Sequence, residues 1–488
     1  MFQSTSCELT FLLIRTSQSS PTTHTRTMNF RFSSPLVQVI IVGLVCFCCP
    51  GMFNALNGLG AGGRIGADVS LVDKANSALY SCFAIIGFFA GSVNNILGFK
   101  LTLFFGTIGY VVYAGSLWSY DRNQNDAFVI AAGALLGASA GLLWTAQGCV
   151  MMSYPEEKDK GKYVSIFWAI FNLGAVLGSI IPLALNIENK SSGGVSDGTY
   201  IAFMIIMMFG ILLILLLKPP NKVTRDDGTP VTLVVSTDWR SELKSIVLLL
   251  GNWRMVLLIP MFLGSNWFYA YQFGINAIYF DVPTRALNGT MAAQIFGSIA
   301  MGWFLDSKFL NRRGRGLAGL AIMGTLFCGV WAGGLAFQLG FERGENLGVG
   351  WSDPRFPGPF VLYFSYGMMD AIYQTYCYWL MGALTNDAAA LSRYAGFYKG
   401  IQSAGGAFSF AIDSVSTPLV IELAISWGLL GLSVPCAFLV ARTVTETNYG
   451  RESDVPVPGD VEMEVGKAKA EEVQASGSVG KDRSGLAV

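Results

Sequence analysis

Twelve long apolar segments constrain the fold of this 488-residue chain more than any other feature of its sequence. A helix needs about 20 mostly apolar residues to cross the hydrocarbon core of a bilayer. Lipid offers no partner to backbone polar groups, so a crossing segment must pair these groups within itself, as a helix does. We therefore predict an all-α polytopic membrane protein with spans near residues 36–60, 76–97, 101–119, 127–152, 163–186, 199–217, 255–280, 286–305, 316–338, 358–384, 394–420 and 424–441.

The spans form two sets of six with nearly equal lengths, separated by a loop that starts with the polar run "KPPNKVTRDDGTP". This layout is typical of transporters built from two parallel halves, each a bundle of six helices. The sequence therefore predicts a cytosolic N-terminal tail, an N-terminal bundle, a cytosolic central loop, a C-terminal bundle and a disordered cytosolic tail, at residues 1–35, 36–217, 218–253, 254–441 and 442–488.

The composition argues against several other classes of protein. Only 13% of the residues are charged, about half the share of an ordinary soluble domain. The 32 basic and 32 acidic residues balance, so no net field attracts nucleic acid. The single histidine, His24, lies in the polar N-terminal stretch, and Cys46, Cys48 and Cys49 lie inside an apolar run, where we interpret them as packing residues. We expect no metal site, no cofactor and no enzymatic activity.

The distribution of Lys and Arg predicts the orientation, because short cytosolic loops carry more of these residues. With both termini in the cytosol, the cytosolic loops hold the larger share, including Lys100, Arg393 and six basic residues of the central loop. The two N-x-[ST] motifs, at Asn189 and Asn288, fall in loops predicted to lie outside, which makes both glycosylation candidates. We expect a plasma membrane or vacuole-like location, and either Met1 or Met28 is the true start.

Two loops carry a motif that the major facilitator superfamily has at these places, G-x-x-x-D-x-x-G-x-[RK]. The recurrence of the motif in both halves favours a cytosolic gate, in which glycines allow close packing and an acid faces a helix N-terminus. Asn95 replaces the acid in the first copy, so that latch should be weaker. The alternative interpretation is a tight turn with solvated basic residues. The positions are Gly91, Asn95, Gly98 and Lys100 in the first copy, and Gly302, Asp306, Arg312 and Arg313 in the second.

Polar residues inside spans are costly and are therefore candidates for function. In this superfamily the first, fourth, seventh and tenth helices line the central cavity. Asp370 is the best candidate for a proton or cation carrier, and Asp413 is a second intramembrane acid; alternatively, each acid only holds the helix packing. The remaining candidates for the cavity are Asn54, Asn57, Gln147, Asn266, Gln272, Asn276, Tyr373 and Gln374.

The triplet Gly58, Gly60 and Gly63 has the G-x-G-x-x-G spacing of a dinucleotide-binding turn. Such a turn requires a short strand before it and a helix after it. Here the triplet follows a long apolar run and precedes a polar loop. We therefore predict no nucleotide partner and interpret these glycines as places where the first helix unwinds or packs closely.

Several longer runs resemble the uncoordinated-ninety-three-like family, a branch of the major facilitator superfamily, and are similar to its fungal members. They are "PGMFNALNGLGAGG", "LLWTAQGCVMMSYP", "YWLMGALTND" and "RYAGFYKGIQSAGGAFSFAID". The resemblance covers roughly residues 36–441 and implies the major facilitator fold. The resemblance does not imply one function, because some relatives regulate potassium channels or potassium balance and others escort receptors. Two hypotheses stay open: a secondary transporter of a small solute or ion, and a non-transporting partner of another membrane protein.

Overall fold

The computed structural model describes residues 31–58, 69–186, 197–225, 228–231, 238–281, 284, 292–345 and 347–449. The predicted tails lie largely outside these residues, as do Gly60, Gly63 and the two glycosylation candidates, Asn189 and Asn288. The chain divides into Met1–Arg31 and Phe32–Val488, and the description below concerns the second part.

The first half consists of α1 (Pro35–Cys46), which continues through the π-helical turn η1 (Phe47–Gly51) into α2 (Met52–Gly58), then α3 (Val69–Leu97), α4 (Phe99–Asn123), α5 (Asp126–Ser153), α6 (Lys160–Asn186) and α7 (Asp197–Leu213). Short 3-10 turns cover Glu157–Asp159, Ile214–Leu216 and Pro220–Lys222. Pro50 lies inside η1, which explains why this span does not continue as a regular α-helix.

The second half consists of α9 (Trp253–Leu257), α10 (Ile259–Trp267), α11 (Tyr269–Tyr279), α13 (Ala293–Asp306), α14 (Arg312–Gln338), α15 (Pro357–Leu384), α16 (Ala388–Ser414) and α17 (Leu419–Ala441). α8 (Trp239–Leu250) lies in the connection between the halves. Each of the twelve predicted spans therefore contains helix. Apart from the isolated bridges Thr224–Pro230 and Phe280–Val349, the described residues pair no strands.

Eight helices of the described residues are long and apolar enough to cross a membrane, or nine if α8 and the helices after it, bent by 56°, count as one span. The predicted number of twelve is thus not reproduced by length and composition alone. α13 is only 14 residues long, and α15 and α16 carry buried polar side chains near their middles, which lowers their hydropathy.

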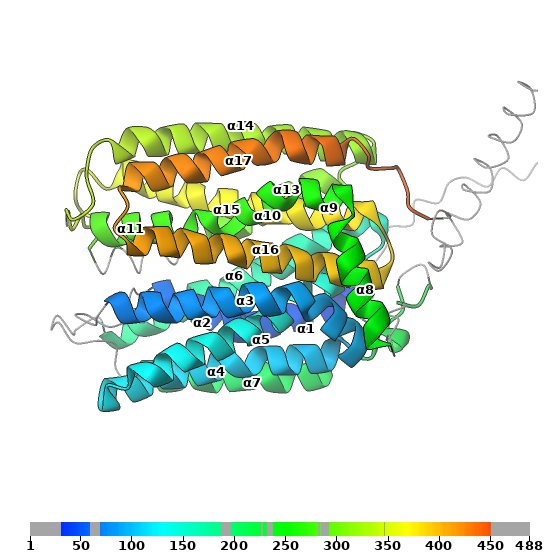
Figure 1. Cartoon of the computed structure of the whole chain (residues 1–488), viewed down its shortest axis with the longest axis horizontal. Coiled ribbons are helices and arrows are strands. Elements are labelled where there is room, and N and C mark those ends of the chain that lie inside the picture. Colours follow the sequence, from blue (N-terminus) through cyan, green and yellow to red (C-terminus); the bar gives the residue numbers. More distant parts are fainter. Residues whose placement is uncertain are drawn as a thin grey trace, which may run out of the picture. The chain divides into compact units, whose positions relative to one another are not determined.

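The helices of the two halves meet along two long contacts. Figure 1 shows α1 to α7 in the lower part of the view and α10 to α17 in the upper part, with α3 beside α16 and α8 across one end. The other contact joins α6 to α13. Glycines make both contacts close: a Cβ on Gly91 would lie 2.6 Å from the Ser392 carbonyl oxygen, and one on Gly302 would lie 2.5 Å from that of Gly161. The boundaries predicted for the two bundles stay a prediction.

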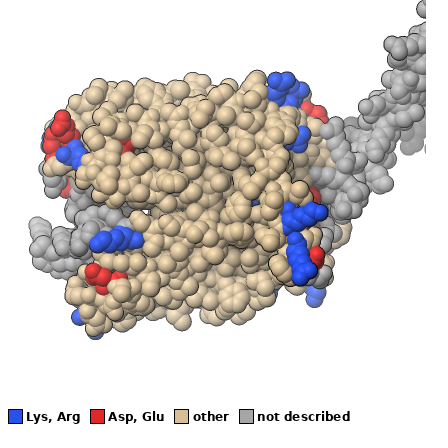
Figure 2. Space-filling model, in the orientation of Figure 1, with Lys and Arg blue, Asp and Glu red and all other residues tan. Residues whose placement is uncertain are grey.

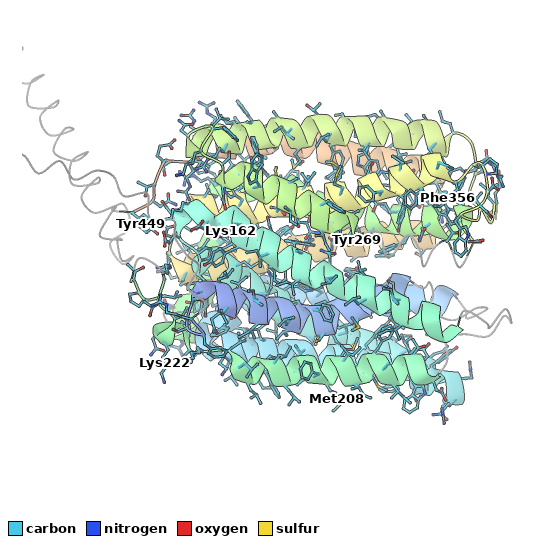
Figure 3. The ribbon with its side chains drawn as sticks, turned by 180° about the vertical axis from the view of Figure 1, so that it is seen from behind. Lys162, Met208, Lys222, Tyr269, Phe356 and Tyr449 are labelled. Atoms are coloured by element: carbon cyan, nitrogen blue, oxygen red, sulfur yellow. The ribbon has the colours of Figure 1, made fainter. Side chains whose placement is uncertain are left out.

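The molecule has two ends, which we name after the helices that lie there in Figure 1. The α8 end carries the turns at residues 98, 154–159, 307–311 and 385–387, and the α11 end carries those at 124–125, 339–356 and 415–418. Figure 3 shows Lys162, Lys222 and Tyr449 at the α8 end and Phe356 at the opposite end. In Figure 2 the charged side chains gather at the two ends, and the face between them is almost free of charge, as expected for a lipid-facing surface.

The helix α8 lies in the predicted central loop and was not expected. Asp238 caps it by accepting hydrogen bonds from the backbone N–H groups of Arg240 and Ser241 at 3.0 and 3.3 Å. One face, formed by Glu242, Ile246 and Leu249, is buried against the bundle. A second face is apolar and exposed, which is typical of a helix that lies in the membrane interface; it consists of Trp239, Leu243, Val247 and Leu250.

Candidate functional site

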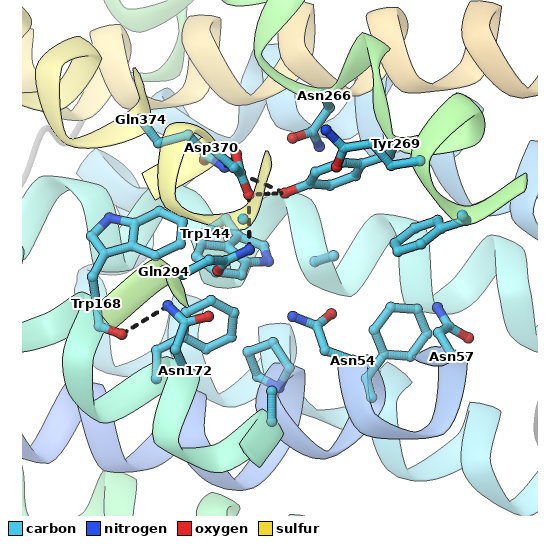
Figure 4. A pocket seen from close by; sticks show the side chains of 18 of the residues that line it. Asn54, Asn57, Trp144, Trp168, Asn172, Asn266, Tyr269, Gln294, Asp370 and Gln374 are labelled. Carbon is cyan, nitrogen blue, oxygen red and sulfur yellow. Dashed lines mark hydrogen bonds between the residues drawn. The ribbon is translucent and has the colours of Figure 1, made fainter. Parts of the chain in front are cut away.

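A cavity of about 320 Å³ lies between the two halves, in the part of the molecule toward the α11 end. It is lined by residues of η1, of α2 to α6, of α10, α11 and α13, and of α15 and α16, and Figure 4 shows it from close by. Its walls combine aromatic rings with many side-chain amides. Asp370 and Lys399 are the charged residues among the described ones that line it. The amides belong to Asn54, Asn57, Asn172, Asn266, Gln272, Asn276, Gln294, Gln374 and Gln402.

Asp370, on α15, is 2% exposed and accepts hydrogen bonds from three side chains. Its Oδ2 accepts from the Tyr269 hydroxyl and from Gln294 Nε2, both at 2.9 Å, and its Oδ1 accepts from Gln374 Nε2 at 2.8 Å (Figure 4). The three donors stabilise the ionised carboxylate, and the Tyr269 hydroxyl can also accept a hydrogen bond from the protonated form, so the site suits both states of Asp370. Through Tyr269 and Gln294, Asp370 joins α15 to α11 and α13.

Lys399, on α16, is buried beside this carboxylate and was missed in the sequence. Its Nζ donates to Gln402 Oε1 at 2.7 Å and to Gln374 Oε1 at 3.4 Å. It also lies 4.7 Å from the ring centroid of Trp144 and 4.8 Å from that of Tyr398, distances at which an ammonium is attracted to a ring face. No described acid forms an ion pair with it. A lysine within the apolar run "RYAGFYKGIQ" was the signal that could have found it.

The cavity brings together most of the residues predicted to line it. Asp370, Gln374, Asn54, Asn57, Asn266, Gln272 and Asn276 all line it. Tyr269, Gln294 and Gln402 are further polar members that the sequence did not single out, besides Lys399.

Three predicted residues lie elsewhere. Gln147 is fully buried outside the cavity and accepts a hydrogen bond from the Tyr378 hydroxyl at 3.5 Å. Tyr373 donates to the Met261 carbonyl oxygen at 3.0 Å, which joins α15 to α10. Asp413 lies at the α11 end, where it pairs with Arg343 at 2.7 Å. These positions favour a packing role for the three side chains.

Several cavity amides make no internal hydrogen bond. Among the described residues, the side chains of Asn54, Asn57 and Gln272 have no such partner, and the Oδ1 atom of Asn266 is buried without one. In Figure 4, Asn54 and Asn266 lie on opposite sides of the cavity. An amide that is left unpaired costs free energy unless water or a ligand supplies the missing bond. These groups are therefore available to a bound solute.

The second copy of the motif joins the two halves at the α8 end. Asp306, at the end of α13, accepts from the backbone N–H groups of Gly161 and Lys162 at 2.9 and 2.6 Å, at the start of α6. This is the predicted arrangement of an acid at a helix N-terminus. Arg312 is buried and Arg313 is exposed.

The first copy lies between α3 and α16. Gly98 has φ +78°, a conformation that favours glycine, and turns the chain from α3 into α4. Gly91 touches α16, and Asn95 donates to the Ala389 carbonyl oxygen at 3.2 Å. Lys100 is half-buried in the first turn of α4. The gating role of both copies stays a prediction, but each copy lies where the two halves meet.

A largely buried carboxylate forms a further contact between the halves at the α8 end. Glu157 pairs with Arg312 at 3.1 Å and accepts from Asn386 Nδ2 at 2.7 Å, so it joins the first half to α14 and to the turn before α16. It also accepts from the Thr447 hydroxyl at 2.8 Å and the Asn448 backbone N–H at 2.9 Å. The chain after α17 is thereby fixed across this end.

We expect Glu157→Gln to lower the melting temperature of the purified protein by several degrees, because loss of one partner leaves Arg312 buried without its counter-charge, a change that typically costs about 3 kcal/mol or more. Differential scanning fluorimetry in detergent measures the shift. Glu156→Gln is the matched control, since Glu156 pairs with Lys158 inside the same turn, where Lys158 is half exposed. Equal shifts in both variants would contradict the role of Glu157.

Comparisons with known proteins agree with this fold. The family model described as "Ion channel regulatory protein UNC-93" matches residues 74–338. UNC93-like protein 1 of Arabidopsis thaliana is 44% identical over 433 residues, which cover 87% of this chain and 94% of the relative. An UNC93-like protein of Schizosaccharomyces pombe is 44% identical over 441 residues, covering 88% and 87%. The major facilitator superfamily transporter FucP, solved in the outward conformation, has a TM-score of 0.57 at 16% identity and covers 86% of this chain and 100% of its own.

Proposed function

This chain belongs to the UNC-93 family and has the major facilitator fold, and on that premise we propose that it is a secondary transporter of a small solute that works by alternating access. The observation that carries the proposal is Asp370, a carboxylate held by three donors inside a cavity between the two halves. A carboxylate in this position can bind a proton on one side of the membrane and release it on the other. Asp370 is therefore the proposed proton carrier.

The closed α8 end supports an alternating cycle. Asp306 and Glu157 join the two halves there, whereas the cavity lies toward the α11 end. For the solute to leave at the α8 end, these contacts must break and the cavity must close at the other side. Rocking of one six-helix half against the other accomplishes both changes.

The lining favours an uncharged solute that forms many hydrogen bonds. Asp370 and Lys399 balance each other, so the described lining carries no net charge. The unpaired amides of Asn54, Asn57 and Gln272 offer both donors and acceptors, and Trp144 and Trp168 offer apolar faces. A volume of about 320 Å³ suits a small molecule.

The orientation follows from charge. The α8 end carries Lys100, Lys158, Lys162, Arg313 and Arg393, and we propose that it faces the cytosol, with both termini on that side. The protein would then reside in the plasma membrane or a vacuole-like membrane, with Asn189 and Asn288 as glycosylation sites on the opposite side.

A thermal-shift screen of the purified protein tests the solute class. We expect uncharged sugars and polyols to raise the melting temperature, since a ligand that binds only the folded state at 100 times its Kd stabilises by about 2.7 kcal/mol. Amino acids, organic anions and potassium salts are the comparison sets. The double variant Asn54→Leu with Gln272→Leu removes two unpaired amides and should abolish the shift. Stabilisation by potassium alone would contradict an uncharged solute.

The second candidate function is a regulator of another membrane protein. The description of the matching family, "Ion channel regulatory protein", favours it. This hypothesis predicts a membrane partner that co-purifies in a fixed ratio, together with the absence of flux in proteoliposomes for every solute that stabilises the protein. Flux of any stabilising solute, abolished by Asp370→Asn, would decide for transport.

A further inference from the structure

We propose that Glu242, on the central-loop helix α8, supplies the acid that the first gating motif lacks, so that α8 is a detachable part of the latch that holds the α8 end closed. The sequence has Asn95 where the motif requires an acid. The inference rests on the proposed transport cycle, because a latch matters only if this end opens.

The carboxylate of Glu242 lies directly against the deficient motif. Its Oε2 accepts from Asn95 Nδ2 at 3.2 Å and from the Ser92 hydroxyl at 3.0 Å, both on α3. Glu242 is 6% exposed, although most other residues of α8 are exposed. A buried carboxylate is costly unless it is paired and hydrogen-bonded, and here Asn95 provides one of the bonds.

The same carboxylate also reaches the second half. Arg393 Nη1, on α16, donates to Glu242 Oε1 at 3.0 Å and to Oε2 at 3.1 Å. Oε2 is therefore shared between Asn95 of the first half and Arg393 of the second. Glu242 joins α3 to α16 through α8, where an acid at position 95 would have joined them directly.

The two copies of the motif thus carry the same charge from different sources. In the second copy the acid, Asp306, belongs to α13 itself and faces the start of α6. In the first copy the acid is 147 positions away from Asn95 in the chain. The weak latch expected from Asn95 is consequently strengthened by α8, a helix that can detach from the bundle while both halves stay folded.

The attachment of α8 fits such a role. Together with Glu242, two apolar residues of α8, Ile246 and Leu249, are buried against the bundle. Asn252, just after α8, donates to the Tyr394 hydroxyl of α16 at 3.2 Å, which places the helix beside Arg393. With so few buried residues, undocking of α8 costs far less than disruption of a span, so α8 docking can set how often this end opens.

Cys149 is a native reporter of opening at the α8 end. It is fully buried, and its thiol lies 3.7 Å from the Ala388 carbonyl oxygen at the start of α16. Labelling of the same protein unfolded in sodium dodecyl sulfate, where Cys149 is accessible, serves as the reference. Maleimide labelling of the full-length protein in mild detergent, followed by peptide mass spectrometry, gives the rate at Cys149 relative to that of the unfolded protein.

We expect Glu242→Gln to raise the relative labelling rate of Cys149 by about tenfold or more, because it removes the counter-charge of Arg393. Asn95→Asp combined with Glu242→Gln should restore the slow rate, since the new carboxylate would lie where Arg393 already shares an acceptor with Asn95. Asn95→Asp alone should accelerate labelling, because it places two acids together. Lys244→Gln removes an exposed charge from α8 and should change nothing.

Unchanged labelling in Glu242→Gln, or no recovery in the double variant, would overturn the proposal. If Glu242→Gln does not fold, Glu242→Asp keeps the charge on a shorter side chain and should give an intermediate rate; a wild-type rate there would count against the inference. The assay needs no solute. A normal labelling response in a protein that transports nothing would therefore reject the transport function and leave the latch in place.

Discussion

Asp370→Asn is expected to reduce proton-driven uptake in proteoliposomes to the background of protein-free liposomes. The reason is that an amide cannot bind and release a proton in the range in which a carboxylate does. Asparagine keeps the size of the side chain and one acceptor oxygen, so Tyr269 and Gln294 retain a partner. Exchange of labelled for unlabelled solute, which needs no net proton movement, should therefore persist. The measurement is uptake under an imposed pH gradient, with the solute that the thermal-shift screen identifies.

Asp413→Asn is the matched control for this experiment. Asp413 is also an acid within a predicted span, but it pairs with Arg343 at the α11 end and does not line the cavity. Its replacement should leave gradient-driven uptake within about twofold of the wild type, in line with the small value of partly exposed ion pairs. Equal losses in both variants would assign the effect to folding, and normal uptake in Asp370→Asn would reject Asp370 as the carrier.

The fold was predictable from the sequence because its cause is local. Each apolar run of about 20 residues must form a helix in lipid regardless of its neighbours. Asp370 was predictable for a similar reason, since an acid within such a run is costly wherever the helix packs. The same rule marks Lys399, which the sequence prediction did not include. The rule overestimated the functional importance of Asp413, which lies close enough to the helix end to pair with Arg343.

The partners of these residues depend on distant parts of the chain. Tyr269 and Gln294 are 101 and 76 positions away from Asp370, and nothing in their own surroundings marks them as its donors. The pairing of Glu242 with Asn95 spans 147 positions. Sequence periodicity reports which face of a helix is apolar, but it does not report which helix that face meets.

Lys399→Met is the second substitution with a large expected effect. Methionine fills a similar volume, so the fold should persist, but Gln402 Oε1 loses its 2.7 Å donor and the melting temperature should fall by a few degrees. Gradient-driven uptake should nevertheless fall by about tenfold or more, because Lys399 is the cation that offsets the cost of ionising Asp370 in a cavity with few other charges. Without it, Asp370 keeps its proton and cannot complete the cycle. Uptake and solute exchange, both measured on one preparation, separate an effect on proton coupling from an effect on solute binding.

The geometry around Lys399 explains why the effect should concern coupling rather than solute binding. Gln374 lies between the two charges: its Nε2 donates to Asp370, and its Oε1 accepts from Lys399. A change at the lysine therefore reaches the carboxylate through one amide. Lys399→Arg keeps the charge and the attraction to the ring of Trp144, so it should retain part of the uptake. A loss of solute exchange in Lys399→Met as severe as the loss of uptake would mean that Lys399 binds the solute. Asp370 would then have to release its proton without help from Lys399.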